Sequence, residues 1–210
     1  MIAESPSSQA RADKLELLAL LEEKARRDAQ RRHLLQFETL YEWQHKFVKA
    51  TADHTSCMLM AANRVGKTRT GLTIDAMHLL GDYPEDWEGH AFDHAPMCWL
   101  LGFSMEKTRD LLQTPLFGTL EGGKWTGGLI PADRIIAHLS ATGTSGAMRQ
   151  ITVRHKSGSQ STVQFWSYSQ GQHAIMGDSV DWYHIDEEPR DKAIYPQEHT
   201  PTAPGGGGRG

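Results

Sequence analysis

The sequence predicts an α/β fold in which strand–turn–helix units build one core. An apolar run at residues 57–61 passes through a glycine-containing turn into a helix-like run that ends near Gly81. A second apolar run, at 97–103, is followed by Ser104, a residue type that caps helices. With 210 residues and 39% hydrophobic content, the chain can bury one substantial core. We therefore expect a single main domain.

A helical extension is predicted before this domain, over residues 1–36. Its apolar positions recur at helical spacing: Leu15, Leu18, Leu21 and Ala25. Cations crowd its end between Lys24 and His33, where they either contact phosphates or a partner, or simply form a solvated helix face. The net charge of −4 argues against a protein coated with nucleic-acid-binding surface, although a local patch can still bind.

The most informative motif is AANRVGKT, from Ala61 to Thr68, which matches the phosphate-loop pattern G-x-x-x-x-G-K-[ST] except at Ala61. Backbone N–H groups in such a turn bind closely spaced phosphate oxygens, and Gly66 lets the backbone approach them. Lys67 adds a compact cation, and the Thr68 hydroxyl is an oxygen ligand for Mg²⁺. The residues expected to contact the triphosphate are Ala62, Asn63, Arg64, Val65, Gly66, Lys67 and Thr68.

Gln44 precedes this loop within the aromatic-rich stretch Tyr41 to Phe47. Its amide can pair with both a donor and an acceptor on a base edge, so we interpret it as the adenine reader. The alternative is an ordinary helix start in which Trp43 and Phe47 pack at i and i+4, and the two interpretations are compatible.

Two β-rich runs, 151–153 and 162–166, flank Lys156–Ser159 and predict a hairpin. Residues 169–177 then form a polar, glycine-bounded loop that either links strands or acts as a switch. The next β-rich run, 180–185, ends in consecutive carboxylates followed by Pro189. Paired with the phosphate loop, this run predicts that Asp186 holds Mg²⁺ and Glu187 polarises the attacking water. The predicted cofactors are ATP and Mg²⁺.

Together the residues resemble the ATPase half of the large terminase subunit of tailed bacteriophages, the motor that pumps DNA into the capsid. The resemblance rests on YEWQ at Tyr41–Gln44, the variant loop AANRVGKT, the hairpin with SYSQGQHAIMG after it, and WYHIDEEP ending at Pro189. It implies a P-loop NTPase of the ASCE or RecA-like type, with a largely parallel central sheet flanked by helices, over residues 37–197.

The family resemblance also implies roles and partners. An arginine inside the loop is typical, which maps to Arg64, acting either on the γ-phosphate or only to stiffen the loop. Catalysis is assigned to Glu187, Arg64 and Lys67, and metal binding to Thr68 and Asp186. Double-stranded DNA, a small terminase subunit, the capsid portal and a homo-oligomeric ring are the implied partners, in the cytoplasm of the bacterial host. Arg109, Arg134 and Arg149 are unranked candidates for an arginine finger supplied by a neighbouring subunit.

The chain departs from the family pattern after Pro189, where no coupling motif, lid or nuclease domain is recognisable. Residues 198–210 are rich in glycine and proline and are predicted to be disordered. We therefore expect a truncated ATPase domain without nuclease activity. Two alternatives stay open: a helicase-like, DNA-stimulated ATPase, and a catalytically impaired remnant that acts by protein binding.

Other chemistries find little support. The eleven histidines show no zinc-ligand spacing, and there is no G-x-S-x-G nucleophile elbow. Cys57 and Cys98 both fall in apolar runs and are predicted to be buried thiols in a reducing compartment. No apolar stretch reaches membrane-spanning length, so no membrane association is expected.

Overall fold

The computed structural model describes residues 6–30, 32–168, 180–187 and 189. It is a mixed α/β fold built on a five-stranded sheet of order β4-β5-β6-β1-β7. The strands are β1 (Met97–Gly102), β4 (Ile135–Ser140), β5 (Met148–Arg154), β6 (Gln160–Ser167) and β7 (Trp182–Ile185). A separate hairpin pairs β2 (Gly118–Glu121) with β3 (Lys124–Gly127).

The sheet is not largely parallel as predicted. β1 pairs in parallel with both β6 and β7, whereas β5 is antiparallel to both β4 and β6. The tight turn between β5 and β6 explains one of the two antiparallel pairings, because a hairpin can join only antiparallel strands. The predicted hairpin is thus confirmed, and the second antiparallel pairing adds β4, whose connection to β5 runs over residues 141–147.

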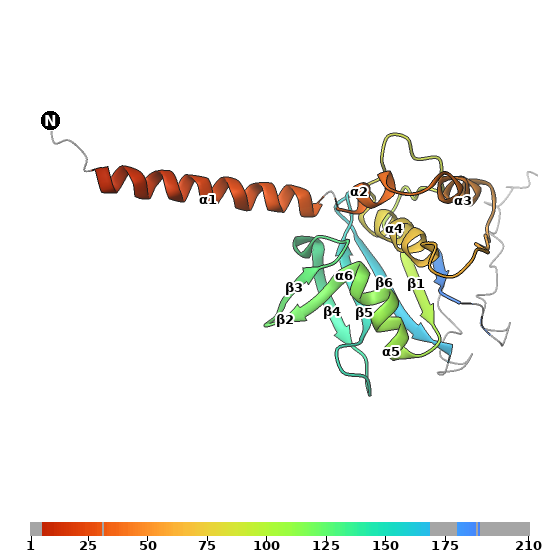
Figure 1. The fold of residues 1–210 in the computed structure, drawn as a ribbon. Coiled ribbons are helices and arrows are strands. Elements are labelled where there is room, and N and C mark those ends of the chain that lie inside the picture. Colours follow the sequence, from red (N-terminus) through yellow and green to blue (C-terminus); the bar gives the residue numbers. More distant parts are fainter. Residues whose placement is uncertain (1–5, 31, 169–179, 188, 190–210) are drawn as a thin grey trace, which may run out of the picture.

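Helices precede the sheet in the sequence, and the last of them packs against β5 and β6 (Figure 1). They are α1 (Pro6–Gln30), α2 (Arg32–Glu38), α3 (Glu42–Asp53) and α4 (Lys67–Leu80). A continuous helical stretch follows β1, comprising α5 (Met105–Thr108), the π-helical turn η1 (Arg109–Gln113) and α6 (Thr114–Phe117). The remaining helical turn, η2 (Ala132–Arg134), leads into β4. Ser104 caps α5 as predicted, its hydroxyl accepting a bond from the Lys107 N–H.

Helix α4 lies at the centre of the packing. Ten of its residues are buried, and Ile74, Ala76, Met77 and Leu79 are fully inaccessible. It contributes to the apolar core against the sheet and also to a second cluster with Phe37, Leu40 and Val48 from α2 and the α3 region. A helix buried on most sides needs no single apolar face. The helix ends at Gly81, as predicted, and the φ of +70° at this residue suits glycine.

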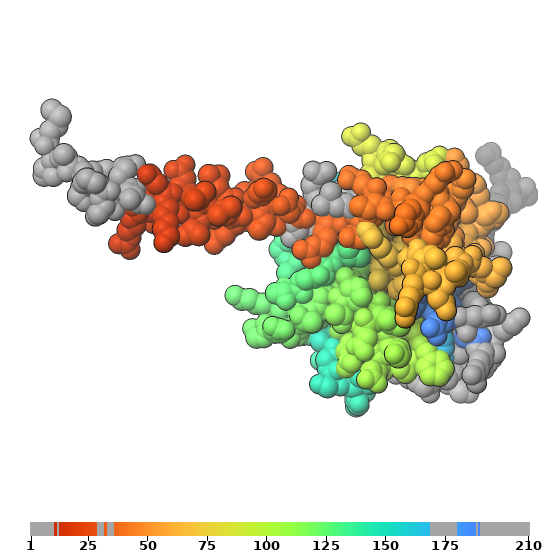
Figure 2. Space-filling view, viewed as in Figure 1, coloured from red at the N-terminus to blue at the C-terminus, as the bar shows by residue number. Residues whose placement is uncertain are grey.

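Helix α1 projects from the body as an arm (Figures 1 and 2). Leu15, Leu18 and Leu21 are 46–60% exposed on it, and Arg26 and Arg27 pair with Glu23. Helix α2 instead packs on α4 and places Phe37 in the core. The predicted tail at 198–210 and the loop at 169–177 lie outside the described residues. No helix in the described part of the chain is long and apolar enough to cross a membrane.

The predicted strand at 57–61 is wrong. These residues pair with no described strand, and Met58 and Met60 are 65% and 83% exposed. The segment and β7 line the same pocket, and the segment takes no place in the described sheet. Cys57 is consequently half-buried, whereas Cys98 in β1 is buried as expected, and burial raises the pKa of both thiols.

Candidate nucleotide site

The candidate site lies where the beginning of α4 meets the end of β7. Gly66 takes a left-handed conformation, with φ +97°, immediately before α4 begins at Lys67. The N–H groups of the first helical turn, which have no carbonyl partner within the helix, therefore point out of this end of α4. There they favour the binding of anions. Thr68 is in that first turn, and Asp186 and Glu187 follow β7.

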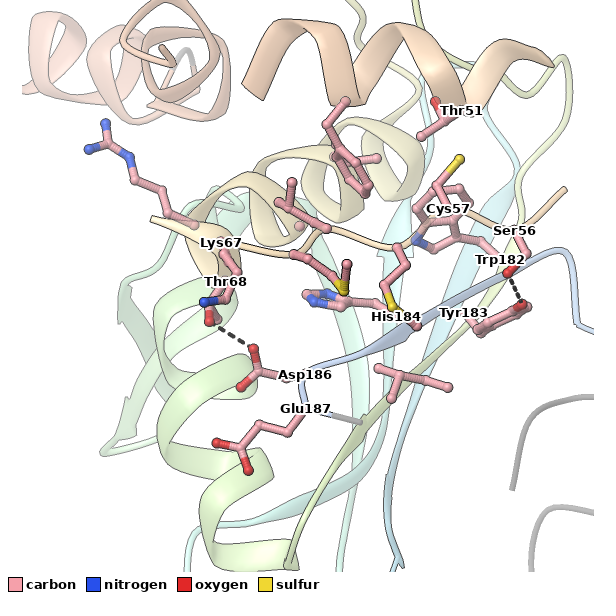
Figure 3. Close-up of a pocket in the computed structure, with 18 of the residues that line it drawn as sticks. Thr51, Ser56, Cys57, Lys67, Thr68, Trp182, Tyr183, His184, Asp186 and Glu187 are labelled. Carbon is pink, nitrogen blue, oxygen red and sulfur yellow. Dashed lines mark hydrogen bonds between the residues drawn. The ribbon is translucent and has the colours of Figure 1, made fainter. Parts of the chain in front are cut away.

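One hydrogen bond joins the two predicted motifs. Thr68 Oγ1 donates to Asp186 Oδ1 at 2.7 Å, although the residues are 118 positions apart in the chain (Figure 3). A hydroxyl and a carboxylate that converge in this way are the hard oxygen ligands that Mg²⁺ prefers. The two residues therefore fit a magnesium ion held beside a phosphate chain.

Lys67 donates from Nζ to the carbonyl oxygens of Ala61 and Ala62, at 2.6 and 2.9 Å. The ammonium group thus lies over the loop that precedes its own helix. A bound anion would have to replace these carbonyls as partners of the Lys67 ammonium group, or share that group with them. The loop residue Arg64 is exposed and has a φ of +63°, a conformation that non-glycine residues seldom adopt.

Gln44 is placed differently from its predicted role. It is 2% exposed, and its amide nitrogen donates to the Thr70 hydroxyl at 2.6 Å and to the Gly66 carbonyl at 3.2 Å. Its amide oxygen accepts from the Tyr41 N–H at 2.7 Å, and its own backbone N–H donates to the Tyr41 carbonyl at 2.9 Å, where α3 begins. The side chain therefore braces the loop from α3. The adenine-reading role stays a prediction that this geometry does not favour.

Glu187 is exposed at the end of β7 and has a φ of +130°. Its backbone carbonyl accepts a hydrogen bond of 2.6 Å from the Tyr168 hydroxyl. Strained backbone of this kind concentrates at functional sites. In Figure 3 its carboxylate lies on the same side of β7 as that of Asp186.

Behind the site, α4 and β7 are joined by a buried polar cluster that sequence reasoning missed. Asp75 is fully buried, and its two oxygens bond Trp182 Nε1 at 2.8 Å and His184 Nδ1 at 2.6 Å. Burial opposes charge on His184, but the charge and hydrogen bond of Asp75 and the charge of Asp186 outweigh it, so the pKa of His184 is raised. The sequence feature that could have revealed this cluster is an aspartate within an apolar helical run.

A pocket of about 790 Å³ opens from this site. It is lined by the loop before α4, by the beginning of α4, by residues 54–60 and by 181–187. Tyr183 reaches across it, with its hydroxyl 3.3 Å from that of Ser56 (Figure 3). The predicted loop, hydroxyl and carboxylates thus share one open cavity, which is large enough for a small-molecule ligand.

The three arginines considered as finger candidates all have partners within the chain. Arg109 bonds the Asp110 carboxylate and the Ser145 carbonyl, and Arg134 bonds Asp82. Arg149 stacks on Trp166, with 3.3 Å between the guanidinium carbon and the ring centroid. Among the described residues, no group of three or more potential metal-binding side chains from His, Cys, Asp and Glu is found.

Fold and site together define a mixed α/β protein in which a loop–helix junction faces carboxylates at a strand end. No protein-family model matches the chain, and no solved structure matches it. It is, however, 30% identical over 195 residues to the terminase large subunit of Salmonella phage P22. This similarity confirms the resemblance to the large terminase subunits of tailed bacteriophages. The match covers 84% of this chain and 39% of the relative, so the chain spans well under half of that protein's length.

Proposed function

We propose that this chain is an ATP-binding and ATP-hydrolysing domain of the terminase type, with a P-loop NTPase fold. The observation that carries the proposal is the 2.7 Å contact between Thr68 and Asp186, which unites a phosphate-loop helix with an acidic strand end. The P22 similarity supports the same assignment. Mg²⁺, when bound with ATP, would neutralise phosphate charge and polarise the bond that breaks.

Each residue has a distinct task in this proposal. The backbone of Ala62–Gly66 and the first turn of α4 bind phosphate oxygens, and Lys67 supplies positive charge to them. Thr68 and Asp186 hold the metal. Glu187 accepts a proton from the attacking water, and Arg64, exposed on the loop, adds charge stabilisation near the γ-phosphate.

As the resemblance implies, hydrolysis would power movement of double-stranded DNA into a capsid, in the cytoplasm of an infected bacterium. The small terminase subunit, the portal and further copies of the chain in a ring are the proposed partners. Because the matched region is 39% of the relative, these steps of the whole motor are inferred from the similarity alone.

The direct test is ATP hydrolysis by the purified chain with Mg²⁺, with and without double-stranded DNA. We expect Lys67→Ala and Glu187→Gln each to lower kcat by about 10²-fold or more, the usual loss for a charge-stabilising donor or a general base. Matched controls are Lys46→Ala and Glu121→Gln, because both residues are exposed and neither lines the pocket. Their rates should stay within about twofold of the unmodified protein.

The outcomes separate the alternatives. DNA stimulation of a Lys67-dependent rate supports a packaging motor or a helicase-like ATPase, and strand separation in the same sample would favour the helicase. ATP binding that needs Lys67, with no turnover above that of Glu187→Gln, would favour a binding remnant. Absence of ATP binding would overturn the proposal.

A further inference from the structure

Three successive positions of α4 make polar or close contacts with β7 and the residue that follows it. Thr68 meets Asp186, Gly71 lies against His184, and Asp75 bonds both His184 and Trp182. Positions 68, 71 and 75 share one face of a helix, and positions 182, 184 and 186 share one face of a strand. The two elements therefore run antiparallel and in fixed register along this surface.

The spacing of these contacts agrees with the geometry of both elements. Thr68 and Asp75 are seven residues apart, about 10 Å along a helix. Asp186 lies two residues beyond His184 and four beyond Trp182, about 7 and 13 Å along a strand. Asp75 therefore contacts two residues of β7, Trp182 and His184, which lie on either side of it along the strand. Thr68 contacts the residue at the end of the strand. A slip of β7 by one residue would turn the side chains of Trp182 and His184, and that of Asp186 just after the strand, to the other face.

The Asp75 carboxylate is well suited to fix this register. It is 0% exposed, and each oxygen is satisfied by a different ring donor of β7. Removing one partner from such a buried charge lowers the stability of the folded state, because the remaining groups cannot form hydrogen bonds with water instead. Gly71 adds a steric element, since a Cβ there would lie 2.3 Å from His184 Cε1. A side chain at position 71 would therefore displace the imidazole.

Building on the proposed function, we propose that Asp75, acting through His184 and Trp182, is a positioning residue that holds Asp186 opposite Thr68. It touches neither nucleotide nor metal. Its effect is on how well the two oxygen ligands are aligned for Mg²⁺, and hence on the affinity for the metal in the nucleotide complex. Residues that orient metal ligands commonly change metal affinity by about 10- to 100-fold when altered.

The test compares nucleotide binding with and without metal, using a fluorescent ATP analogue in a Mg²⁺ titration. For Asp75→Asn we expect the Mg²⁺ concentration at half-maximal binding to rise about tenfold or more. Metal-free binding of the analogue should stay within about twofold, because the phosphate loop is untouched. A second reading needs no ligand: the Trp182 indole N–H, observed by NMR, should exchange faster with solvent in this variant.

Gln113→Leu is the matched control for mere loss of stability. Gln113 is also buried and bonds the Gly146 carbonyl and the Met148 N–H, away from the nucleotide site. It should lower the unfolding midpoint without moving the Mg²⁺ midpoint. If Asp75→Asn does not fold, His184→Gln, which alters the same cluster from β7, decides the question. If Asp75 and His184 act as one unit, the Mg²⁺ midpoint of the double variant is no higher than that of the more severe single variant.

Failure of the inference and failure of the proposed function are distinguishable. If the unmodified protein binds no ATP analogue in Mg²⁺, the nucleotide site itself is wrong. If it binds with a clear Mg²⁺ dependence and the folded Asp75 or His184 variants keep the same midpoint, Asp75 has no positioning role. An equal shift in Gln113→Leu would also overturn the inference, because general loosening would then explain it.

Discussion

Tyr168 presents a single-residue test of how Glu187, the proposed catalytic carboxylate, is held. Its hydroxyl donates to the backbone carbonyl of Glu187 at 2.6 Å, at a residue whose φ of +130° is unfavourable without support. We expect Tyr168→Phe to lower kcat about three- to tenfold with little change in KM, the equivalent of one hydrogen bond of about 1 kcal/mol. The measurement is steady-state ATP hydrolysis in Mg²⁺.

Tyr183→Phe is the control for this change, because it removes a hydroxyl that contacts Ser56 in the same pocket and not Glu187. Its kcat should be close to that of the unmodified protein. A KM increase in Tyr168→Phe, or equal losses in both variants, would argue against a role in holding Glu187.

At the residue scale, the sequence predicted the groups whose chemistry has a recognisable pattern. Lys67, Thr68 and Asp186 were predicted because phosphate and Mg²⁺ binding restrict both residue type and spacing. Asp75 and His184 were not, because their importance comes from a tertiary contact across 109 positions, which no local pattern encodes. Gln44 was predicted to read adenine, and its buried partners in the structure, the Gly66 carbonyl and the Thr70 hydroxyl, could not be predicted from a local pattern.

At the scale of elements, the end of α4 offers a test of why that helix stops where it does. Gly81 has a φ of +70°, and a Cβ there would lie 2.2 Å from the His155 ring. We expect Gly81→Ala to lower the free energy of unfolding by about 2–4 kcal/mol, because it adds overpacking to the left-handed backbone cost. Urea denaturation measures this change.

Gly143→Ala separates the two contributions. Gly143 has a similar φ of +83°, and nothing lies within 4 Å of its added Cβ. It should therefore cost only the backbone term, about 1–2 kcal/mol. Equal losses at the two positions would show that the His155 contact contributes nothing.

Elements with strong local signals were predictable, and those defined by pairing were not. The caps at Ser104 and Gly81 and the turn between β5 and β6 carry their own chemistry, so sequence alone located them. The apolar run at 57–61 has the composition of a buried strand, yet a strand exists only where another strand accepts its hydrogen bonds. The hairpin β2–β3 and strand β4 were missed because their short runs have weak periodicity.

At the scale of the whole molecule, His78 connects several elements and makes stability depend on pH. It is fully buried on α4 and its ring contacts Tyr83, Trp87, His90, Phe92 and Trp182, which belong to the loop after α4 and to β7. Its Nδ1 lies 2.9 Å from the Tyr83 hydroxyl. Burial, reinforced by the nearby charge of His90, lowers the pKa of His78 from 6.5 to about 3.

The sign of the effect follows from which state binds the proton. Between pH 6.5 and about 3, the unfolded chain protonates His78 while the folded chain does not, so acid favours unfolding. The folded state loses about 1.4 kcal/mol per pH unit across this window from His78 alone. Above pH 6.5 both states are neutral and the contribution is constant.

We therefore expect His78→Phe, which keeps a ring in the aromatic cluster, to flatten the acid side of the stability profile. From pH 7 to pH 4.5, the unmodified protein should lose about 2–3 kcal/mol more than the variant, measured by urea denaturation at each pH. His94→Phe is the control, because the pKa of His94 is raised by its bond to Asp93 and its loss cannot remove an acid-side penalty of this sign. Parallel profiles for the unmodified protein and His78→Phe would mean that His78 is protonated, or reached by water, within the folded molecule.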